Sequence, residues 1–150
     1  LYEQFKLLKR NYKAILCGII SGMLSSLTTI FILSWLFHFD HSAYTTLLPK
    51  SITTAIGIGV SEELGGFVSI TAAVIILTGV VGNIFAEGVL KVMRITHPIS
   101  KGVAIGSSAH AVGTAKALEM GKVEGAMSSL SLVISGLLTV IFAPIFAGLL

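Results

Sequence analysis

The chain has 150 residues, of which 54% are hydrophobic and only 11% are charged. A typical soluble domain carries about 25% charged residues, and a mean hydropathy of +0.94 is too high for a domain that must cover itself with polar groups. This composition excludes a small water-soluble domain, and it excludes a disordered chain, which needs low hydrophobicity and high net charge. The net charge is only +3, and a single cysteine, Cys17, can form neither an internal disulfide nor a multi-cysteine metal site. We therefore expect a membrane protein with no cofactor and no nucleic-acid partner.

Three segments contain no Asp, Glu, Lys, Arg or His: residues 14–37, 64–86 and 125–150. Each is longer than the roughly 20 apolar residues that cross a 30 Å hydrocarbon core as a helix. The basic residues before the first segment resemble the start of a signal peptide, but the apolar run is too long and no small-residue cleavage site follows it. The sequence predicts three transmembrane helices.

Two weaker segments, residues 49–66 and 98–121, are rich in Ser, Thr and Gly and carry glycines near their middles. Broken backbone at membrane depth must be buried in protein or line a watery cavity. Both segments start with proline, which suits the first turn of a helix, so helices are expected to begin at Pro49 and Pro98. We predict two discontinuous helical segments, either re-entrant or broken.

Lys and Arg residues favour the re-entrant interpretation, because they concentrate in cytoplasmic loops. If both weak segments dip and return, nine cations are cytoplasmic and one is outside; if both cross fully, the split is six to four. A broken crossing helix stays open as the alternative. Residues 1–13 are then cytoplasmic, and the two polar segments approach the membrane midplane from opposite faces. The nine cytoplasmic cations are Lys6, Lys9, Arg10, Lys13, Lys91, Arg94, Lys101, Lys116 and Lys122, with Lys50 outside.

An internal repeat is suggested by an offset of 60 residues, which aligns Thr54-Ala55 with Thr114-Ala115 and Leu77 with Leu137. Few positions match, and biased composition is the alternative explanation. We predict an inverted repeat with units 49–90 and 98–148. Paired glycine-interrupted segments in two repeats indicate the binding site of a transporter.

The first candidate binding segment holds Lys50, Ser51, Thr53 and Thr54. A helix N-terminus attracts anions through its unpaired N–H groups, and these side chains add hydroxyl donors and one full charge. Together they suit a small carboxylate. The alternative is structural, with Ser51 capping a helix and Lys50 lying among lipid headgroups.

The second candidate segment supplies Ser107, Ser108, His110, Gly113 and Thr114. An ionisable residue at membrane depth suggests function, and a histidine switches protonation near physiological pH. His110 is therefore expected to bind substrate or carry a proton, unless a neighbouring carbonyl or serine simply satisfies it. A Ser–His pair also suggests a nucleophile and base, but no orienting carboxylate lies nearby, so we expect no enzyme.

Two further motifs leave alternatives open. His38, Asp40 and His41 cluster in one loop, but without thiolates or a second acid they are weak evidence for a metal site, and no metal is expected. Gly18 and Gly22 form a small-xxx-small motif, which permits close helix packing either inside the molecule or between copies.

These motifs resemble the LrgB/CidB family of bacterial membrane proteins. The resemblance rests on residues 48–56, 60–66 and 121–128, and on the His-x-x-Gly-Thr-Ala-Lys-Ala pattern at residues 110–117. Many members carry Ser directly before the histidine, where this chain has Ala109. Members are usually longer at the N-terminus, so the resemblance implies that residues 1–150 are the C-terminal part of a single LrgB-like membrane domain.

The resemblance implies two functions. One is an antiholin- or holin-like component that works with a small LrgA/CidA-type membrane protein to modulate murein hydrolase export and autolysis. The other is a carrier of small carboxylates, by similarity to bacterial pyruvate uptake and the plastid glycolate/glycerate transporter.

Our prediction is an all-α polytopic protein of the bacterial plasma membrane, with three transmembrane helices and two discontinuous segments. It transports small monocarboxylates by alternating access, with the antiholin role as the alternative. The expected partners are the carboxylate, the small membrane protein, the lipid bilayer and further copies of the chain.

Overall fold

The computed structural model describes residues 4–150, and the described part is helical throughout, as predicted. Three of its helices are long and apolar enough to cross a membrane, over Leu7–Leu36, Val68–Val92 and Lys122–Ala147. These windows confirm the three predicted spans. In chain order the helices are α1 (Phe5–Leu36), α2 (His41–Leu47), α3 (Thr54–Glu63), α4 (Val68–Val92), α5 (Pro98–Met120) and α6 (Lys122–Ala147).

Three helix ends are closed in the same way. The helices α1, α3 and α4 are each followed by one residue with positive φ, and the next N–H donates back into the last turn. This geometry satisfies the carbonyls at a helix end, and glycine adopts it at no steric cost. It also explains why the second span begins at Val68, four residues later than predicted. The residues with positive φ are His38 (55°), Gly65 (77°) and Arg94 (53°).

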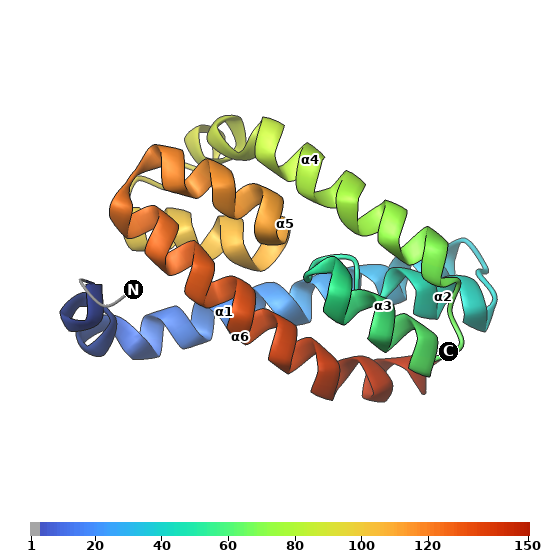
Figure 1. Cartoon of the computed structure of the whole chain (residues 1–150). Helices are drawn as coiled ribbons and strands as arrows, with labels where there is room; N and C mark the ends of the chain where they lie inside the picture. Colours follow the sequence, from blue (N-terminus) through green and yellow to red (C-terminus); the bar gives the residue numbers. More distant parts are fainter. Residues whose placement is uncertain (1–3) are drawn as a thin grey trace.

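The first polar segment reverses direction near the middle of the molecule. In Figure 1, α2 runs inward from the end of the molecule opposite the N-terminus, and α3 returns toward that end. Residues 48–53, here named the first tip, form the turn between them. The predicted helix start at Pro49 is wrong, because Pro49 lies in this turn and α3 begins at Thr54. The short helix α2 was not predicted; Asp40 caps it by accepting a hydrogen bond from Ala43 N (3.3 Å).

The second polar segment, α5, begins at Pro98 as predicted and reverses at His110, whose φ of 41° and ψ of −136° are not helical. Ile105 and Ala117 pack in one apolar cluster with Ala86 and Leu90 of α4. A straight helix would place Ile105 and Ala117 about 18 Å apart, so the shared cluster requires two arms folded together. Figure 1 shows this helical hairpin beside the N-terminal half of α6. Residues 107–112 are named the second tip.

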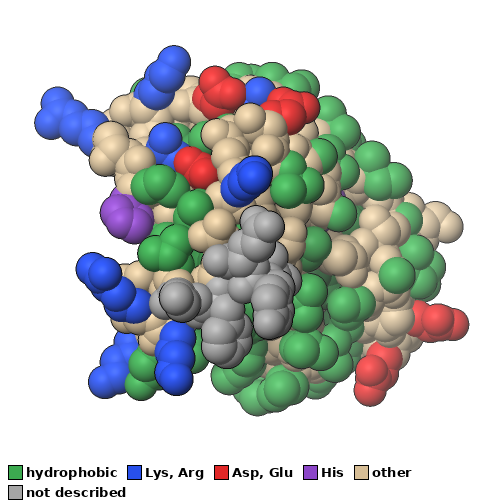
Figure 2. All heavy atoms as spheres, turned by 60° about the vertical axis from the view of Figure 1, so that its left-hand side comes forward, with side chains coloured by type: hydrophobic (Ala, Val, Ile, Leu, Met, Phe, Trp, Pro, Cys, Tyr) green, Lys and Arg blue, Asp and Glu red, His purple; other side chains and the backbone are tan. Residues whose placement is uncertain are grey.

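The two reversals enter the molecule from opposite ends, which is the arrangement that the re-entrant interpretation requires (Figure 1). The duplication of residues 49–90 and 98–148 stays a prediction. The two ends also differ in charge. Figure 2 shows Lys and Arg side chains gathered where α1 begins, α4 ends and α6 begins, and this surface is named the charged end.

Glycines set the close contacts of α5. A Cβ on Gly102 would overlap the Glu124 carbonyl, and one on Gly106 would overlap the Ser128 carbonyl, so α6 lies directly against the first arm of α5. On the other side, a Cβ on Gly22 of α1 would lie 2.9 Å from Ser107 Oγ. The small-xxx-small motif of α1 therefore serves internal packing against α5.

Candidate functional site

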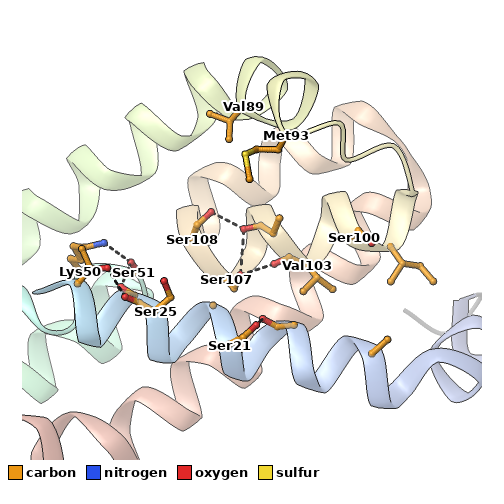
Figure 3. Close-up of a pocket in the computed structure, with 17 residues that line it drawn as sticks. Ser21, Ser25, Lys50, Ser51, Val89, Met93, Ser100, Val103, Ser107 and Ser108 are labelled. Carbon is orange, nitrogen blue, oxygen red and sulfur yellow. Dashed lines mark hydrogen bonds between the residues drawn. The ribbon is translucent and has the colours of Figure 1, made fainter.

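A chamber of about 940 Å³ lies between α1, the C-terminal end of α4 and the first arm of α5 (Figure 3). It receives residues from both tips, although they reverse from opposite ends of the molecule. Eight hydroxyl-bearing side chains and one charged side chain line this space, which is named the polar chamber: Ser21, Ser25, Ser26, Thr29, Lys50, Ser51, Ser100, Ser107 and Ser108.

The first tip supplies the charge. Lys50 Nζ donates a hydrogen bond to Ser51 Oγ (3.0 Å), and Ser51 Oγ lies 2.9 Å from Ser26 Oγ of α1. An ammonium group has three donors, so this contact leaves two for other partners. Among the described residues, no acidic side chain lines the chamber, and its wall therefore carries a single positive charge.

Helix α1 contributes a row of hydroxyls that the sequence analysis missed. Ser21, Ser25, Ser26 and Thr29 all line the chamber. Ser21, Ser25 and Thr29 follow one another at spacings of four residues, which places them on one face of a helix, and Ser26 lies at the edge of that face. This periodicity within an otherwise apolar span was a signal in the sequence that could have identified α1 as one side of the polar chamber.

The second tip adds Ser107 and Ser108 to the same chamber. Ser107 Oγ donates to Val103 O (2.8 Å) and Ser108 Oγ donates to Ala104 O (2.7 Å), one helical turn earlier. These bonds satisfy the hydroxyl hydrogens within the first arm of α5. The oxygen lone pairs remain available to whatever enters the chamber.

His110 does not line the chamber. Its ring is 2% exposed and points to α4, where Nε2 lies 2.7 Å from the Ile75 carbonyl. Because a carbonyl only accepts, Nε2 carries the hydrogen. Gly79 makes room for the ring, since a Cβ there would lie 2.9 Å from Nε2. The contact is the structural alternative raised from the sequence, and the hydrogen bonds of Ser107 and Ser108 do not involve His110.

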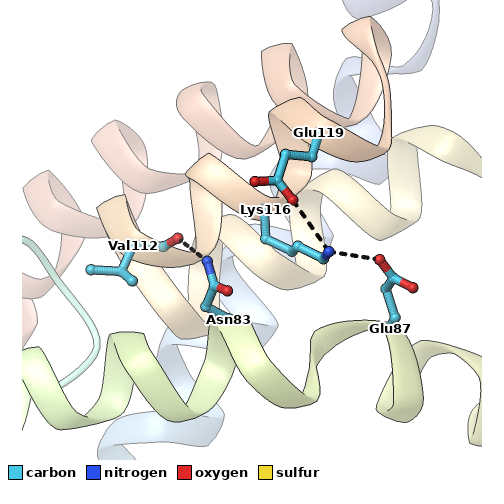
Figure 4. Close-up of polar contacts among 5 residues, drawn as sticks. All are labelled: Asn83, Glu87, Val112, Lys116 and Glu119. Carbon is cyan, nitrogen blue, oxygen red and sulfur yellow. Dashed lines mark hydrogen bonds and ion pairs between the residues drawn. The ribbon is translucent and has the colours of Figure 1, made fainter.

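Other bonds hold the second arm of α5 in place. Thr114 Oγ1 donates to His110 O (2.8 Å) and lies 2.8 Å from Ser128 Oγ of α6. Asn83 Nδ2 of α4 donates to Val112 O (2.8 Å), as Figure 4 shows.

Of the nine predicted site residues, the structure brings four together in the chamber: Lys50, Ser51, Ser107 and Ser108. The five that do not line the chamber are Thr53, Thr54, His110, Gly113 and Thr114.

A second, much smaller space lined partly by hydroxyl groups adjoins the chamber. A space of about 10 Å³ lies between the tips and α6, lined by hydroxyls of Ser26, Ser51, Ser107, Ser135 and Thr139. Ser135 Oγ is buried without a hydrogen-bond partner. Ser26, Ser51 and Ser107 border both spaces, and Leu48 of the first tip packs beside them in an apolar cluster with Ala147 of α6.

The acidic side chains lie elsewhere. Lys116 Nζ pairs with Glu87 Oε1 (2.9 Å) and Glu119 Oε2 (3.2 Å) toward the charged end (Figure 4). Within residues 4–150, no three His, Cys, Asp or Glu side chains come together as metal ligands.

The fold and chamber define a helical membrane protein with two reversing polar segments that meet between its spans. The chain belongs to the LrgB-like family, whose family model matches residues 1–149. This confirms the resemblance seen in the motifs.

Curated relatives support the assignment. The chain is 39% identical over all 150 residues to the antiholin-like protein LrgB of Bacillus subtilis (strain 168), and covers 65% of that protein. It is 37% identical over 146 residues, or 97% of the chain, to proteins of the same name in Bacillus cereus (strain B4264) and Bacillus anthracis (strain CDC 684 / NRRL 3495), covering 64% of each. The chain thus spans slightly less than two thirds of these relatives, and their shared name is not that of an enzyme. No solved structure matches the chain.

Proposed function

We propose that the polar chamber is part of a membrane path for small monocarboxylates. The observation that carries the proposal is the ammonium of Lys50 beside eight hydroxyl-bearing side chains, with no acidic side chain among the described lining residues, at the place where both tips meet. Lys50 is half-buried, and a charge withdrawn from water is stabilised by an opposite partner, which a solute carboxylate would provide. A dianion would bring one negative charge that no wall residue compensates, so a monoanion fits best.

The start of α3 adds to this preference. Its N-cap residue Thr53 makes no side-chain cap bond, so the first N–H groups of the helix keep their positive potential. In Figure 1 this helix start lies near the middle of the molecule, next to the first tip. A carboxylate held by Lys50 is therefore also favoured by the helix dipole.

Alternating access is the proposed mode of passage. The chamber lies between α1 and α4, and the first tip is joined to α1 by the Ser26–Ser51 hydrogen bond. Leu48 of the tip also packs in one apolar cluster with Met23 and Leu27 of α1. Small shifts of the two tips, which reverse from opposite ends, would open the chamber to one side at a time. In this proposal the protein lies in the plasma membrane with residues 1–13 in the cytoplasm.

Uptake into proteoliposomes tests the proposal. The whole protein is reconstituted with and without its small partner membrane protein, and entry of labelled pyruvate or glycolate is measured. We expect saturable uptake that Lys50→Met abolishes and Lys50→Arg partly retains, while the control Lys13→Met on the surface of α1 has no effect. Non-saturable leakage of unrelated solutes would show a pore instead of a carrier.

A second candidate function is an antiholin-like role, and the comparisons favour it over carboxylate transport because every relative described above is named antiholin-like. In that role the protein acts with a small LrgA/CidA-type membrane protein on murein hydrolase export and autolysis. The test is the rate of autolysis in cells that lack the protein and are complemented with variants. If Lys50→Met complements fully and the packing variant Gly102→Leu does not, the charge of the chamber is not needed for the antiholin-like role.

A further inference from the structure

A second hollow, separate from the polar chamber, lies at the charged end. It encloses about 650 Å³ between the last turns of α4, the turn that leads into α5, and the junction of α5 with α6. It shares no lining residue with the chamber. Its lining residues are Glu87, Leu90, Lys91, Arg94, Ile95, Thr96, Lys101, Met120 and Glu124.

The hollow is positively charged. Lys91, Arg94 and Lys101 come from three places in the chain, and none pairs with an acid among the side chains that the structure describes. Glu87 is already compensated by Lys116 (Figure 4). With Glu87 and Glu124 counted against Lys91, Arg94 and Lys101, the described lining keeps a net charge of +1, and this surplus favours an anionic ligand.

The donors suit a phosphate group. The planar guanidinium of Arg94 can donate two parallel hydrogen bonds to phosphate oxygens, and the two lysines add charge from either side. Thr96 contributes a hydroxyl. The start of α5 is adjacent, and its N-cap residue His97 makes no side-chain cap bond, so its first N–H groups also favour an anion.

The surroundings favour a phosphate that carries acyl chains. On the α4 turns that lead to the hollow, the apolar side chains Phe85 and Val92 are exposed, and Val92 is 82% exposed. Lys91 and Arg94 thus lie at the end of an apolar span, where lipid headgroups meet water. Basic pockets between transmembrane helices bind the headgroups of anionic lipids in this way.

We propose that this hollow binds the phosphate group of an anionic phospholipid, with the lipid chains lying along α4. The ligand fixes the turn between α4 and α5, and with it the first arm that forms a wall of the polar chamber. The inference is independent of the carboxylate path.

Native mass spectrometry of the chain in neutral detergent tests the site. Phosphatidylglycerol is titrated against phosphatidylcholine, and bound lipids are counted. We expect retained phosphatidylglycerol and little phosphatidylcholine. The variant Lys91→Gln/Arg94→Gln/Lys101→Gln should bind phosphatidylglycerol about a hundredfold more weakly, since each cation contributes roughly a factor of five.

The matched control is Lys9→Gln/Arg10→Gln/Lys13→Gln, which removes the same charge from exposed positions of α1 and should change the affinity less than about threefold. Thermal unfolding of both variants checks that they fold, and the single variant Lys101→Gln gives a milder second test. Inorganic phosphate is titrated in parallel. Equal binding of phosphate and phosphatidylglycerol would identify a free-phosphate site with the same chemistry. Equal loss of lipid in both triple variants, or no loss in either, would overturn the proposal.

Discussion

Ser26 Oγ of α1 and Ser51 Oγ of the first tip lie 2.9 Å apart. This hydrogen bond joins a transmembrane helix to a turn that reverses near the middle of the molecule. Because Ser51 Oγ also accepts from Lys50 Nζ, the same hydroxyl pair positions the one charged group among the described residues that line the polar chamber. The position of that charge therefore depends on how α1 and the first tip pack together.

Thiol labelling will show whether water reaches the chamber. In a Cys17→Ser background, Ser25→Cys and Ser108→Cys should react with a membrane-impermeant thiol reagent in proteoliposomes, because both positions line the chamber. Leu137→Cys is the control, since Leu137 is 60% exposed on α6 but faces acyl chains in a bilayer. Reaction at Leu137→Cys that is as fast as at Ser108→Cys would contradict a hydrated chamber.

Gly106→Ala should destabilise the fold. The added Cβ would overlap backbone atoms of Ser128, which cannot move without shifting α6, and such overpacking costs about 1–3 kcal/mol. Gly88→Ala in α4 meets nothing within 4 Å and should be neutral or stabilising by up to about 1 kcal/mol. Thermal unfolding in detergent measures both, and equal effects would mean that α5 and α6 are not in close contact.

His38→Gly should raise the free energy of unfolding. His38 has φ of 55°, and a left-handed conformation costs a residue with a Cβ about 1–2 kcal/mol. Gly65→Ala, at φ of 77°, should lower stability by a similar amount because it introduces the same strain. Thermal unfolding measures both variants: the midpoint should rise for His38→Gly and fall for Gly65→Ala. Two shifts of the same sign would contradict a positive φ at both positions.

His110→Gly should be more stable than His110→Ala by about 1 kcal/mol. Both variants lose the hydrogen bond to Ile75 O, but only glycine relieves the positive φ at this position. This order reverses the usual preference of helices for alanine. Denaturant unfolding of the two variants provides the comparison, and a more stable alanine variant would show that α5 does not reverse at residue 110.

Much of the fold was predictable because membrane burial imposes simple constraints. The absence of charge over residues 14–37, 64–86 and 125–150 located the spans, and the glycine-interrupted segments located the two reversals. The short helix α2 was missed because its seven residues carry no periodic signal strong enough to distinguish them from a loop. The start of α3 was misplaced because proline is as common in turns as at helix starts.

The candidate site was predictable only in part. Lys50, Ser51, Ser107 and Ser108 stand out as polar residues near the reversals, and they meet in the chamber. The direction of His110 depends on a carbonyl 35 residues away and on the positive φ at its own backbone, which local sequence does not reveal. The α1 row was overlooked because hydroxyls such as Thr29, which donates to Ser25 O (2.7 Å), are satisfied within their own helix and so are compatible with an apolar span.

Both arms of α5 rest on the beginning of α6, with Gly106 against Ser128 on one arm and Leu118 beside Gly125 on the other. Because the ribosome makes α6 after α5, the hairpin lacks this packing partner while it is being synthesised. The second tip therefore reaches its packed position only after α6 has been synthesised, so the close contacts of Gly106 and Gly125 form after both arms of α5 already exist.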